Sequence, residues 1–359
     1  MKLQKLILNN FKNFEHFEAG FHPQVNGFTG NNGVGKTNLL DAIYTLAMGK
    51  SYFGLTNRQL IRHGQDFYSI KAVFQRDGDT FEILLKYREG EKKSLSVNGK
   101  EYPRLSDHIG LIPVVMISPY DRDLISESGE TRRRFADRLI AQYDKDYLNN
   151  LIRYTRTLRQ RNTLLKYFAA NGTFDAARLE TYDEALARYA AVIHTKRQQF
   201  VQSLTPLLNE KYARIAGTGE QPGLTYRSTL NQIDPRELLH RNLERDRLLQ
   251  YTSDGIHRDD LIFTLNGHPI KKFGSQGQQK SFLIALRLAE ADMLFSRKND
   301  APILLFDDIF DKLDPGRVRQ ILDYVKHRRF GQVFITDTHP ERVSQLLEAL
   351  DRQAGIFEL

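Results

Sequence analysis

Residues 30–37 have the residue types and spacing of a phosphate-binding loop. They read GNNGVGKT and fit the pattern GxxxxGK[ST] at every position. Glycine and asparagine let the backbone curl so that its N–H groups face phosphate oxygens, and the following helix start adds positive potential. Lys36 is expected to neutralise phosphate charge as a catalytic residue, and Thr37 to place its hydroxyl on Mg²⁺. The predicted nucleotide contacts here are Gly30, Asn31, Asn32, Gly33, Val34, Gly35, Lys36, Thr37 and Asn38.

A pair of carboxylates follows an apolar run far along the chain. Residues 303–306 read ILLF and predict a buried strand that ends at Asp307 and Asp308. In P-loop enzymes the strand-end aspartate holds Mg²⁺ directly or through water, which is the role predicted for Asp307. Asp308 is predicted to act in catalysis by orienting or deprotonating the attacking water. The alternative is a strand that leads into a helix cap, where acidic residues are also common.

The distance between these two motifs narrows the class of P-loop protein. Thr37 and Asp307 lie 270 residues apart, whereas kinases and small GTPases place the carboxylate strand much closer to the loop. A large insertion between loop and carboxylates is typical of ATP-binding-cassette heads. The phosphate-binding loop alone does not distinguish kinases, GTPases, transporter motors and DNA machines from one another.

A second candidate phosphate site lies at the start of a predicted helix, residues 276–296. A serine hydroxyl and glycine N–H groups at a helix start form an anion site. The segment resembles the cassette signature Leu-Ser-Gly-Gly-Gln, with Gln276 in place of its first glycine; in that family the signature binds the γ-phosphate held by the other subunit. The alternative is only a capped helix. The residues concerned are Ser275, Gln276, Gly277 and Gln278.

Two further segments resemble parts of such heads. Residues 310–314, FDKLD, are similar to the D-loop that follows the carboxylates, with Asp314 at the family's aspartate. His339 follows a predicted strand at residues 333–336. It is interpreted either as the switch histidine that reads the γ-phosphate or as a surface histidine, because its offset from the strand exceeds the usual pattern.

The elements that would position these motifs fall into three zones. The first is rich in strands, with alternating residues predicting an antiparallel meander over 67–74, 81–87 and 94–97. The middle zone is helical, with a break at residues 171–173 that predicts an antiparallel helix pair. The third starts with a hairpin at 261–270 and then alternates helices and strands. We therefore predict an α/β fold: an ATPase domain of residues 1–118 and 250–359, and a mainly helical insertion of residues 119–249.

Two sets of motifs resemble the RecF family of recombination-repair proteins. Residues 9–14 and 35–43 look like the heads of SMC-type DNA machines. Residues 118–121 with 131–134, and residues 253–260 with 273–280, resemble RecF more closely, in order along nearly the whole chain. The chain departs from the family at Tyr120. Asp308 agrees with RecF, but transporter and SMC heads usually carry glutamate there, and the shorter side chain predicts slow ATP turnover.

The resemblance implies a function that residue chemistry does not provide. It implies duplex DNA beside single-stranded gaps as the substrate, partnership with RecR and RecO, and help in loading the recombinase RecA at stalled forks. It also implies ATP and Mg²⁺ as cofactors and a homodimer that forms with ATP.

Composition agrees with a DNA partner. The chain has a formal net charge of +8, no cysteine and no long apolar run, which favours a polyanionic partner, a reducing cytoplasm and no membrane span. Two other classes fit the sequence less well. This chain departs from the signature of a transporter motor, and an SMC protein would contain several hundred residues of heptad repeats. The residues predicted to contact DNA phosphates are Lys50, Arg58, Arg62, Arg153, Arg156 and Arg159.

Overall fold

The computed structural model describes residues 1–217, 219–310, 313–327, 331–350 and 354–359. The chain divides into two units, each assembled from separated segments. The first unit consists of Met1–Asp121, Lys211–Thr218 and Lys280–Leu359, and the second consists of Arg122–Glu210 and Gly219–Gln279. The predicted return to the ATPase domain at residue 250 differs from this division, in which the first unit resumes at Lys280.

The first unit contains a five-stranded parallel sheet. Its strand order is β14 (Ala354–Glu358), β3 (Val25–Thr29), β13 (Gln332–Thr336), β12 (Ile303–Asp307) and β8 (Val114–Ile117). Every residue of the four strands after β14 in this order is buried, as expected for parallel strands covered on both faces. The predicted strands at 303–306 and 333–336 are confirmed, whereas β14 was not predicted.

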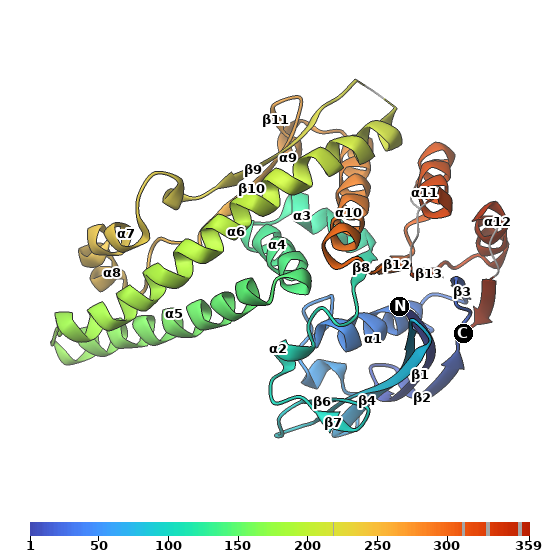
Figure 1. Ribbon diagram of the computed structural model, residues 1–359, viewed down its shortest axis with the longest axis horizontal. Coiled ribbons are helices and arrows are strands. Elements are labelled where there is room, and N and C mark those ends of the chain that lie inside the picture. The colour runs from blue at the N-terminus through green and yellow to red at the C-terminus, as the bar shows by residue number, and fades with distance from the viewer. Residues whose placement is uncertain (218, 311–312, 328–330, 351–353) are drawn as a thin grey trace. The chain divides into compact units, whose positions relative to one another are not determined.

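Helices cover both faces of this sheet (Figure 1). Helix α1 (Lys36–Met48) lies on one face and α12 (Pro340–Leu350) on the other. A side chain at Gly27 in β3 would come within 2.4 Å of the Val343 side chain of α12, so the glycine permits this close packing. Helix α11 (Pro315–His327) packs beside α12.

A six-stranded antiparallel sheet lies on the other side of α1 (Figure 1). Its order is β2 (Phe14–Gly20), β1 (Lys2–Phe11), β4 (Phe67–Arg76), β5 (Asp79–Arg88), β6 (Ser94–Val97) and β7 (Lys100–Glu101). Alternate residues of β4 are buried, so one face of this sheet packs on the core. The predicted meander is confirmed. Helix η1 (Arg58–Leu60) precedes β4, α2 (Leu105–His108) lies between β7 and β8, and η2 (Pro119–Arg122) follows β8.

The second unit is built on two long helices. Helix α5 (Lys145–Asn171) ends at Gly172, which has a φ of 59°, and α6 (Ala176–Ala216) returns along it. The two helices share an apolar cluster that includes Leu164, Phe168 and Leu179. The predicted antiparallel pair is confirmed (Figure 1). The shorter elements of this unit are α3 (Asp123–Ser126), α4 (Gly129–Tyr143), η3 (Thr229–Asn231), α7 (Pro235–Arg241), α8 (Leu243–Leu249) and α9 (Ile270–Phe273).

A small sheet explains why residues 250–279 belong to this unit. Strand β10 (Asp260–Leu265) pairs with β11 (His268–Pro269) through an Asn266-Gly267 turn, which confirms the predicted hairpin. On its other edge β10 pairs with β9 (Pro222–Arg227). The interval 119–249 was predicted to be mainly helical, and β9 is a strand within it that was not predicted.

The RecF-like segments at residues 131–134 and 253–260 bind each other inside the second unit. The guanidinium of Arg132 donates to both carboxylate oxygens of Asp260, at 2.8 and 3.0 Å. Arg197 of α6 lies 3.3 Å from the carboxylate of Asp259, and both side chains are buried. These segments therefore join α4, α6 and β10.

Helix α10 (Gln276–Lys298) begins in the second unit and continues in the first. Its bounds agree with the predicted helix at residues 276–296 to within two residues. Among the described helices, none is long and apolar enough to cross a membrane.

Candidate nucleotide-binding site

The predicted phosphate loop connects β3 to α1 at the carboxyl edge of the parallel sheet. Gly30, Gly33 and Gly35 all have positive φ, at 140°, 88° and 119°, which other residues rarely adopt. Gly35 is the N-cap residue of α1 and has no side chain to cap the helix. The first N–H groups of α1 therefore face the loop, as in an anion site.

The ammonium group of Lys36 folds back onto the loop. It donates to the carbonyl oxygens of Gly30 at 2.8 Å and Asn31 at 3.1 Å, and its side chain is buried. These carbonyls hold the positive charge at the centre of the loop. A phosphate bound there would meet a preplaced cation.

Thr37 and Asp307 meet as the sequence predicts. The Thr37 hydroxyl donates to Oδ1 of Asp307 at 2.7 Å. Thr336 and Ser118 also donate to this carboxylate, at 3.2 and 3.4 Å. Strands β8, β12 and β13 thus each end with an oxygen-bearing side chain beside the start of α1.

This set of oxygens fits Mg²⁺. Hydroxyl and carboxylate oxygens are hard ligands, and protein Mg²⁺ sites use one or two carboxylates completed by water and phosphate. Within the described ranges no cluster of three or more His, Cys, Asp and Glu residues could hold a metal, so a metal at Asp307 would need those further oxygens. Burial raises the pKa of Asp307 to about 6, against the hydrogen bond from Thr37, and the charge of Asp308 adds to the rise.

Asp308 has an unusual backbone conformation. Its φ is 45°, in the left-handed region, and its N–H donates to the Thr336 hydroxyl at 3.0 Å. Its side chain is half-buried next to Asp307. The turn therefore directs two successive carboxylates to the edge of the sheet where the loop lies.

Asn13 makes hydrogen bonds that hold the phosphate loop in place, and the GxxxxGK[ST] motif did not predict this contact. Its amide donates to the Val34 carbonyl at 2.8 Å, and its Oδ1 accepts from Asn38 at 2.8 Å. A side chain at Gly35 would come within 2.6 Å of Asn13. The turn between β1 and β2 therefore fixes the outer side of the loop. Asn13 lies in a segment resembling SMC heads, which was the only sequence signal for it.

The predicted signature forms the N-terminus of α10, in the second unit. The Ser275 hydroxyl accepts from the N–H of Gln278 at 3.2 Å, and the Gln278 side chain accepts from the N–H of Ser275 at 2.7 Å. This is a reciprocal capping box. Gln278 also donates to Glu220 at 2.6 Å. Ser275 and Gln276 are exposed and Gly277 is half-buried, so the capped helix start is accessible.

The predicted D-loop and the predicted switch histidine lie at the starts of two different helices, α11 and α12. Asp311 and Lys312 of the predicted D-loop lie outside the described residues. Asp314 caps α11: its carboxylate accepts from the N–H of Arg317 at 3.1 Å. His339 is exposed at the start of α12, where its N–H donates to the buried carboxylate of Asp337 at 2.9 Å.

The residues predicted to contact DNA phosphates are divided between the two units. Lys50, Arg58 and Arg62 belong to the first unit; Arg58 is paired with Glu89 at 3.0 Å, and Arg62 with Glu15 at 3.2 Å. The three arginines of α5 belong to the second unit and are exposed: Arg153, Arg156 and Arg159.

The fold and this site together define a P-loop ATPase head of the ATP-binding-cassette type. The model of the family described as RecF/RecN/SMC N terminal domain matches residues 2–358. The chain is 50% identical to the DNA replication and repair protein RecF of Flavobacterium johnsoniae over 359 residues, covering 100% of both chains. It is 44% identical to RecF of Parabacteroides distasonis, covering 100% of this chain and 97% of that one. The chain belongs to the RecF family.

Solved structures agree with this assignment. A structure of the recombination mediator protein RecF with ATP, in the RecFOR pathway, superposes with a TM-score of 0.89 at 28% identity, covering 99% of this chain and 95% of that one. An Smc head bound to the C-winged helix domain of ScpA gives a TM-score of 0.55 at 16% identity, covering 96% and 92%. The latter likeness concerns the fold alone.

Proposed function

We propose that this chain is an ATP-dependent DNA-binding protein of recombination repair. It dimerises when it binds ATP on duplex or gapped DNA, hydrolyses ATP slowly, and assists recombinase loading at single-stranded gaps and stalled forks. Its location is the cytoplasm. The observation that carries this proposal is the contact between Thr37 and Asp307 beside Lys36, in a chain that matches a RecF protein over 359 residues.

The chemistry of the site divides among four side chains. Lys36 neutralises phosphate charge, Thr37 and Asp307 hold Mg²⁺, and Asp308 orients and deprotonates the attacking water. ATP supplies a γ-phosphate that ADP lacks. Contacts to that phosphate favour the closed state by differential affinity, and their loss on hydrolysis reopens it.

Dimerisation would use the exposed start of α10. Ser275 and the N–H groups beside it form a capped, accessible anion site that can take the γ-phosphate held by a second copy of the chain. Asp314 and His339 complete the nucleotide contacts. Ser275→Arg should leave ATP binding intact and abolish ATP-dependent dimers in light scattering, because a bulky side chain blocks the site. Normal dimers of this variant would exclude the model.

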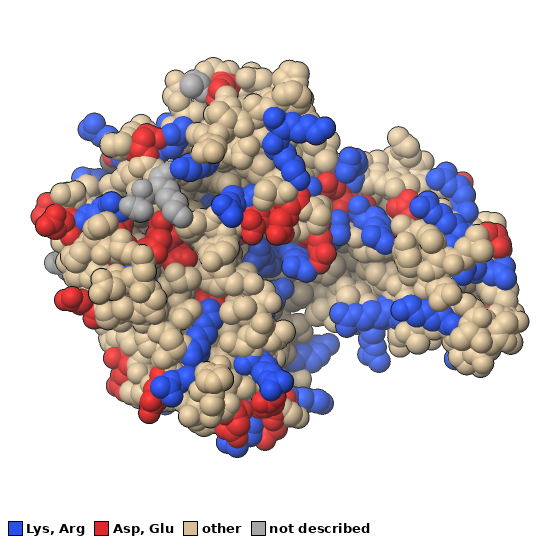
Figure 2. Space-filling model, turned by 180° about the vertical axis from the view of Figure 1, so that it is seen from behind, with Lys and Arg blue, Asp and Glu red and all other residues tan. Residues whose placement is uncertain are grey.

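DNA binding is supported by the charge of α5. Between residues 147 and 171 the sequence contains no Asp or Glu, and Arg153, Arg156 and Arg159 are exposed there. Figure 2 shows a row of basic side chains along the helical part of the second unit, with few acidic ones in that row. Contacts of this kind bind phosphates without reading sequence. Lys50, Arg58 and Arg62 of the first unit are further candidates.

Salt dependence tests the role of α5. If its three arginines each contact a phosphate, replacing all three with Gln should reduce the slope of log affinity against log salt by about 3. The matched control replaces Lys2, Lys86 and Lys100, which are exposed on the antiparallel sheet, and removes the same charge. An equal loss of slope in both variants would show that only net charge matters.

Substrate and partners follow from the family. We propose single-stranded/duplex junctions as the preferred DNA, with RecR and RecO as partners. Gel shifts on gapped, duplex and single-stranded DNA, each with ATP, ADP or no nucleotide, test the preference. The expected order is gapped or duplex DNA with ATP above every other combination, and equal binding with ATP and ADP would contradict an ATP switch. No observation favours the alternatives, a transporter subunit or a small SMC-like head, over this function.

A further inference from the structure

Helix α10 carries the signature at its first turn and is fixed inside the first unit three turns later, at Arg287. The guanidinium of Arg287 contacts two carboxylates. It donates to Asp121 through Nε at 3.1 Å and through Nη2 at 2.6 Å, and to Glu290 through Nη1 at 2.6 Å. All three side chains are at most 7% exposed. Planar two-point contacts of this kind fix both distance and orientation.

Tyr52, in the loop after α1, completes this cluster. Its hydroxyl donates to Asp121 and accepts from Arg287 at 2.7 Å. The carboxylate of Asp121 therefore accepts from the loop after α1 and from α10 at once. A buried polar network that is satisfied in this way has one preferred arrangement.

Asp121 is in turn joined to the metal site. Its Oδ2 accepts from the N–H of Ser118 at 3.1 Å, while the Ser118 hydroxyl donates to Asp307 at 3.4 Å. Ser118 thus bonds both carboxylates, one through its backbone and one through its side chain. A continuous path runs from Asp307 through Ser118 and Asp121 to Arg287.

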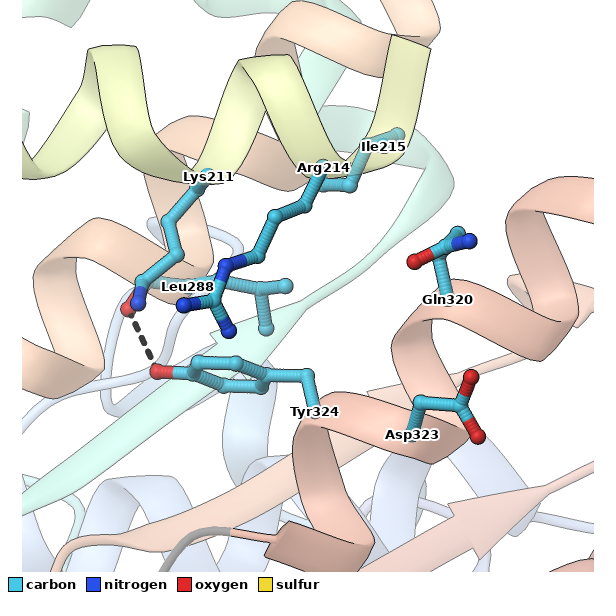
Figure 3. Close-up of a pocket in the computed structure, with 7 residues that line it drawn as sticks. All are labelled: Lys211, Arg214, Ile215, Leu288, Gln320, Asp323 and Tyr324. Carbon is cyan, nitrogen blue, oxygen red and sulfur yellow. Dashed lines mark hydrogen bonds between the residues drawn. The ribbon is translucent and has the colours of Figure 1, made fainter. Parts of the chain in front are cut away.

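A second polar cluster holds α10 through residues other than those of this path. The hydroxyl of Tyr324, in α11, donates to the Leu288 carbonyl at 3.0 Å and to Asp292 at 2.5 Å. Lys211 of α6 pairs with Asp292 at 2.5 Å, and its ammonium lies 4.8 Å from the centre of the Tyr324 ring. Figure 3 shows Lys211 and Tyr324 facing each other beside Leu288. Lys211, Leu288 and Tyr324 line a cavity of about 90 Å³.

We propose that Arg287 is a positioning residue that transmits the state of the nucleotide site to the signature of the same subunit. A change at Asp307 on binding ATP and Mg²⁺ moves Ser118, and Asp121 passes that movement to Arg287. Because α10 is one continuous helix, its first turn responds, and Ser275 is presented to a second copy. The inference rests on the proposed ATP switch and adds the residues that connect the nucleotide site to the signature.

The test places a fluorescent reporter beside the signature. The chain has no tryptophan, and Phe273 is 68% exposed two residues before Ser275, so Phe273→Trp gives a single emission signal. Ser275→Arg in the same chain keeps the protein monomeric, so any change on adding ATP and Mg²⁺ arises within one subunit. We expect a clear emission change that Asp121→Asn and Tyr52→Phe each reduce about fivefold or more at saturating ATP.

Tyr324→Phe is the matched control, because it removes a buried hydroxyl contact from the same helix but not from the path. It should lower the unfolding midpoint as much as Tyr52→Phe and leave the emission change intact. Three results would overturn the inference: no ATP-dependent change in the reference protein, a change retained in both path variants, or an equal loss in Tyr324→Phe. Arg287→Lys, which keeps the charge and loses the two-point contact, should behave as Tyr52→Phe does.

This experiment is independent of dimerisation. Light scattering on the chain without Ser275→Arg tests the proposed dimer separately. Monomers with ATP in that measurement would refute the dimer, whereas the emission change would still report on the path through Arg287.

Discussion

Asp308→Asn separates catalysis from ATP binding, and its effect can be worked out from the conformation of the residue. Asp308 has a φ of 45°, and asparagine is among the few residues that adopt this region readily. The backbone N–H that donates to Thr336 is unchanged by the substitution. We therefore expect the free energy of unfolding to change by less than about 1 kcal/mol.

The expected loss of rate is large. Asn keeps the shape of the side chain but has no basic oxygen to accept a proton. Loss of a general base costs about 10²- to 10⁴-fold in rate, or about 3–5 kcal/mol in the activation barrier. ATP affinity depends on Lys36 and the loop backbone, so it should stay within about threefold of the wild-type value. A change of that size is smaller than the effect of losing one hydrogen bond.

Three measurements on one variant make the test. Single-turnover hydrolysis gives the chemical rate, equilibrium binding of ATP gives affinity, and dissociation from DNA gives the lifetime of the closed dimer. The variant should leave DNA more slowly than the wild type with ATP, and equally fast with ADP. Asp307→Asn is the matched neighbour and should instead weaken Mg²⁺-dependent ATP binding. Hydrolysis of Asp308→Asn within about threefold of wild type would falsify the assignment and leave Asp308 as a structural turn residue.

Three other predictions concern the support of the site and the fold. Asn13→Ala removes both braces of the phosphate loop; ATP affinity should fall about fivefold while hydrolysis at saturating ATP is kept, which steady-state kinetics will show. Burial holds the pKa of Asp307 at about 6, so kcat/KM for ATP with Mg²⁺ should fall about tenfold per pH unit below 6. Because that pKa is raised on folding, its contribution to stability without metal is lost as pH rises from about 4 to about 6, as urea titrations in EDTA should report. Asp246→Ala leaves the buried guanidinium of Arg161 with one carboxylate fewer and should cost about 3–5 kcal/mol in chemical denaturation. Glu180→Ala, in an exposed pair with Arg236, should cost less than about 1 kcal/mol.

Local signals in the sequence predicted the parts of the site that one segment specifies. The phosphate loop and the strand ending at Asp307 follow from spacing and apolar runs, and the contact between Thr37 and Asp307 follows from Mg²⁺ chemistry. Asn13 and Ser118 carry no such signal, because each acts only through a partner that the fold brings to it. The hydroxyl of Ser118 reaches Asp307 across 189 residues of sequence. No periodicity reveals a contact of that kind.

Strand β9 was missed for a related reason. It is six residues long, starts with Pro222-Gly223, and lies at an edge of its sheet. Proline and glycine in a short segment indicate a loop unless a partner strand is known. Its partner β10 lies more than thirty residues further on. The predicted return at residue 250 differs from the division of the structure for the same reason, since β10 pairs with β9 and both lie in the second unit.

The sequence motifs of this chain serve two different purposes. Those around Lys36 and Asp307 form the candidate nucleotide site, where Thr37 contacts Asp307 at a sheet edge. The segments at 131–134 and 253–260 instead bind each other through Arg132 and Asp260 inside the second unit. The side chains of Arg132 and Asp260 are 12% and 10% exposed. A charge pair with so little exposure is costly to break from one side, so each segment constrains the other even if neither touches ATP. Substitution at Asp260 should therefore be judged first by unfolding and only then by activity, whereas substitution at Asp308 should be judged in the opposite order.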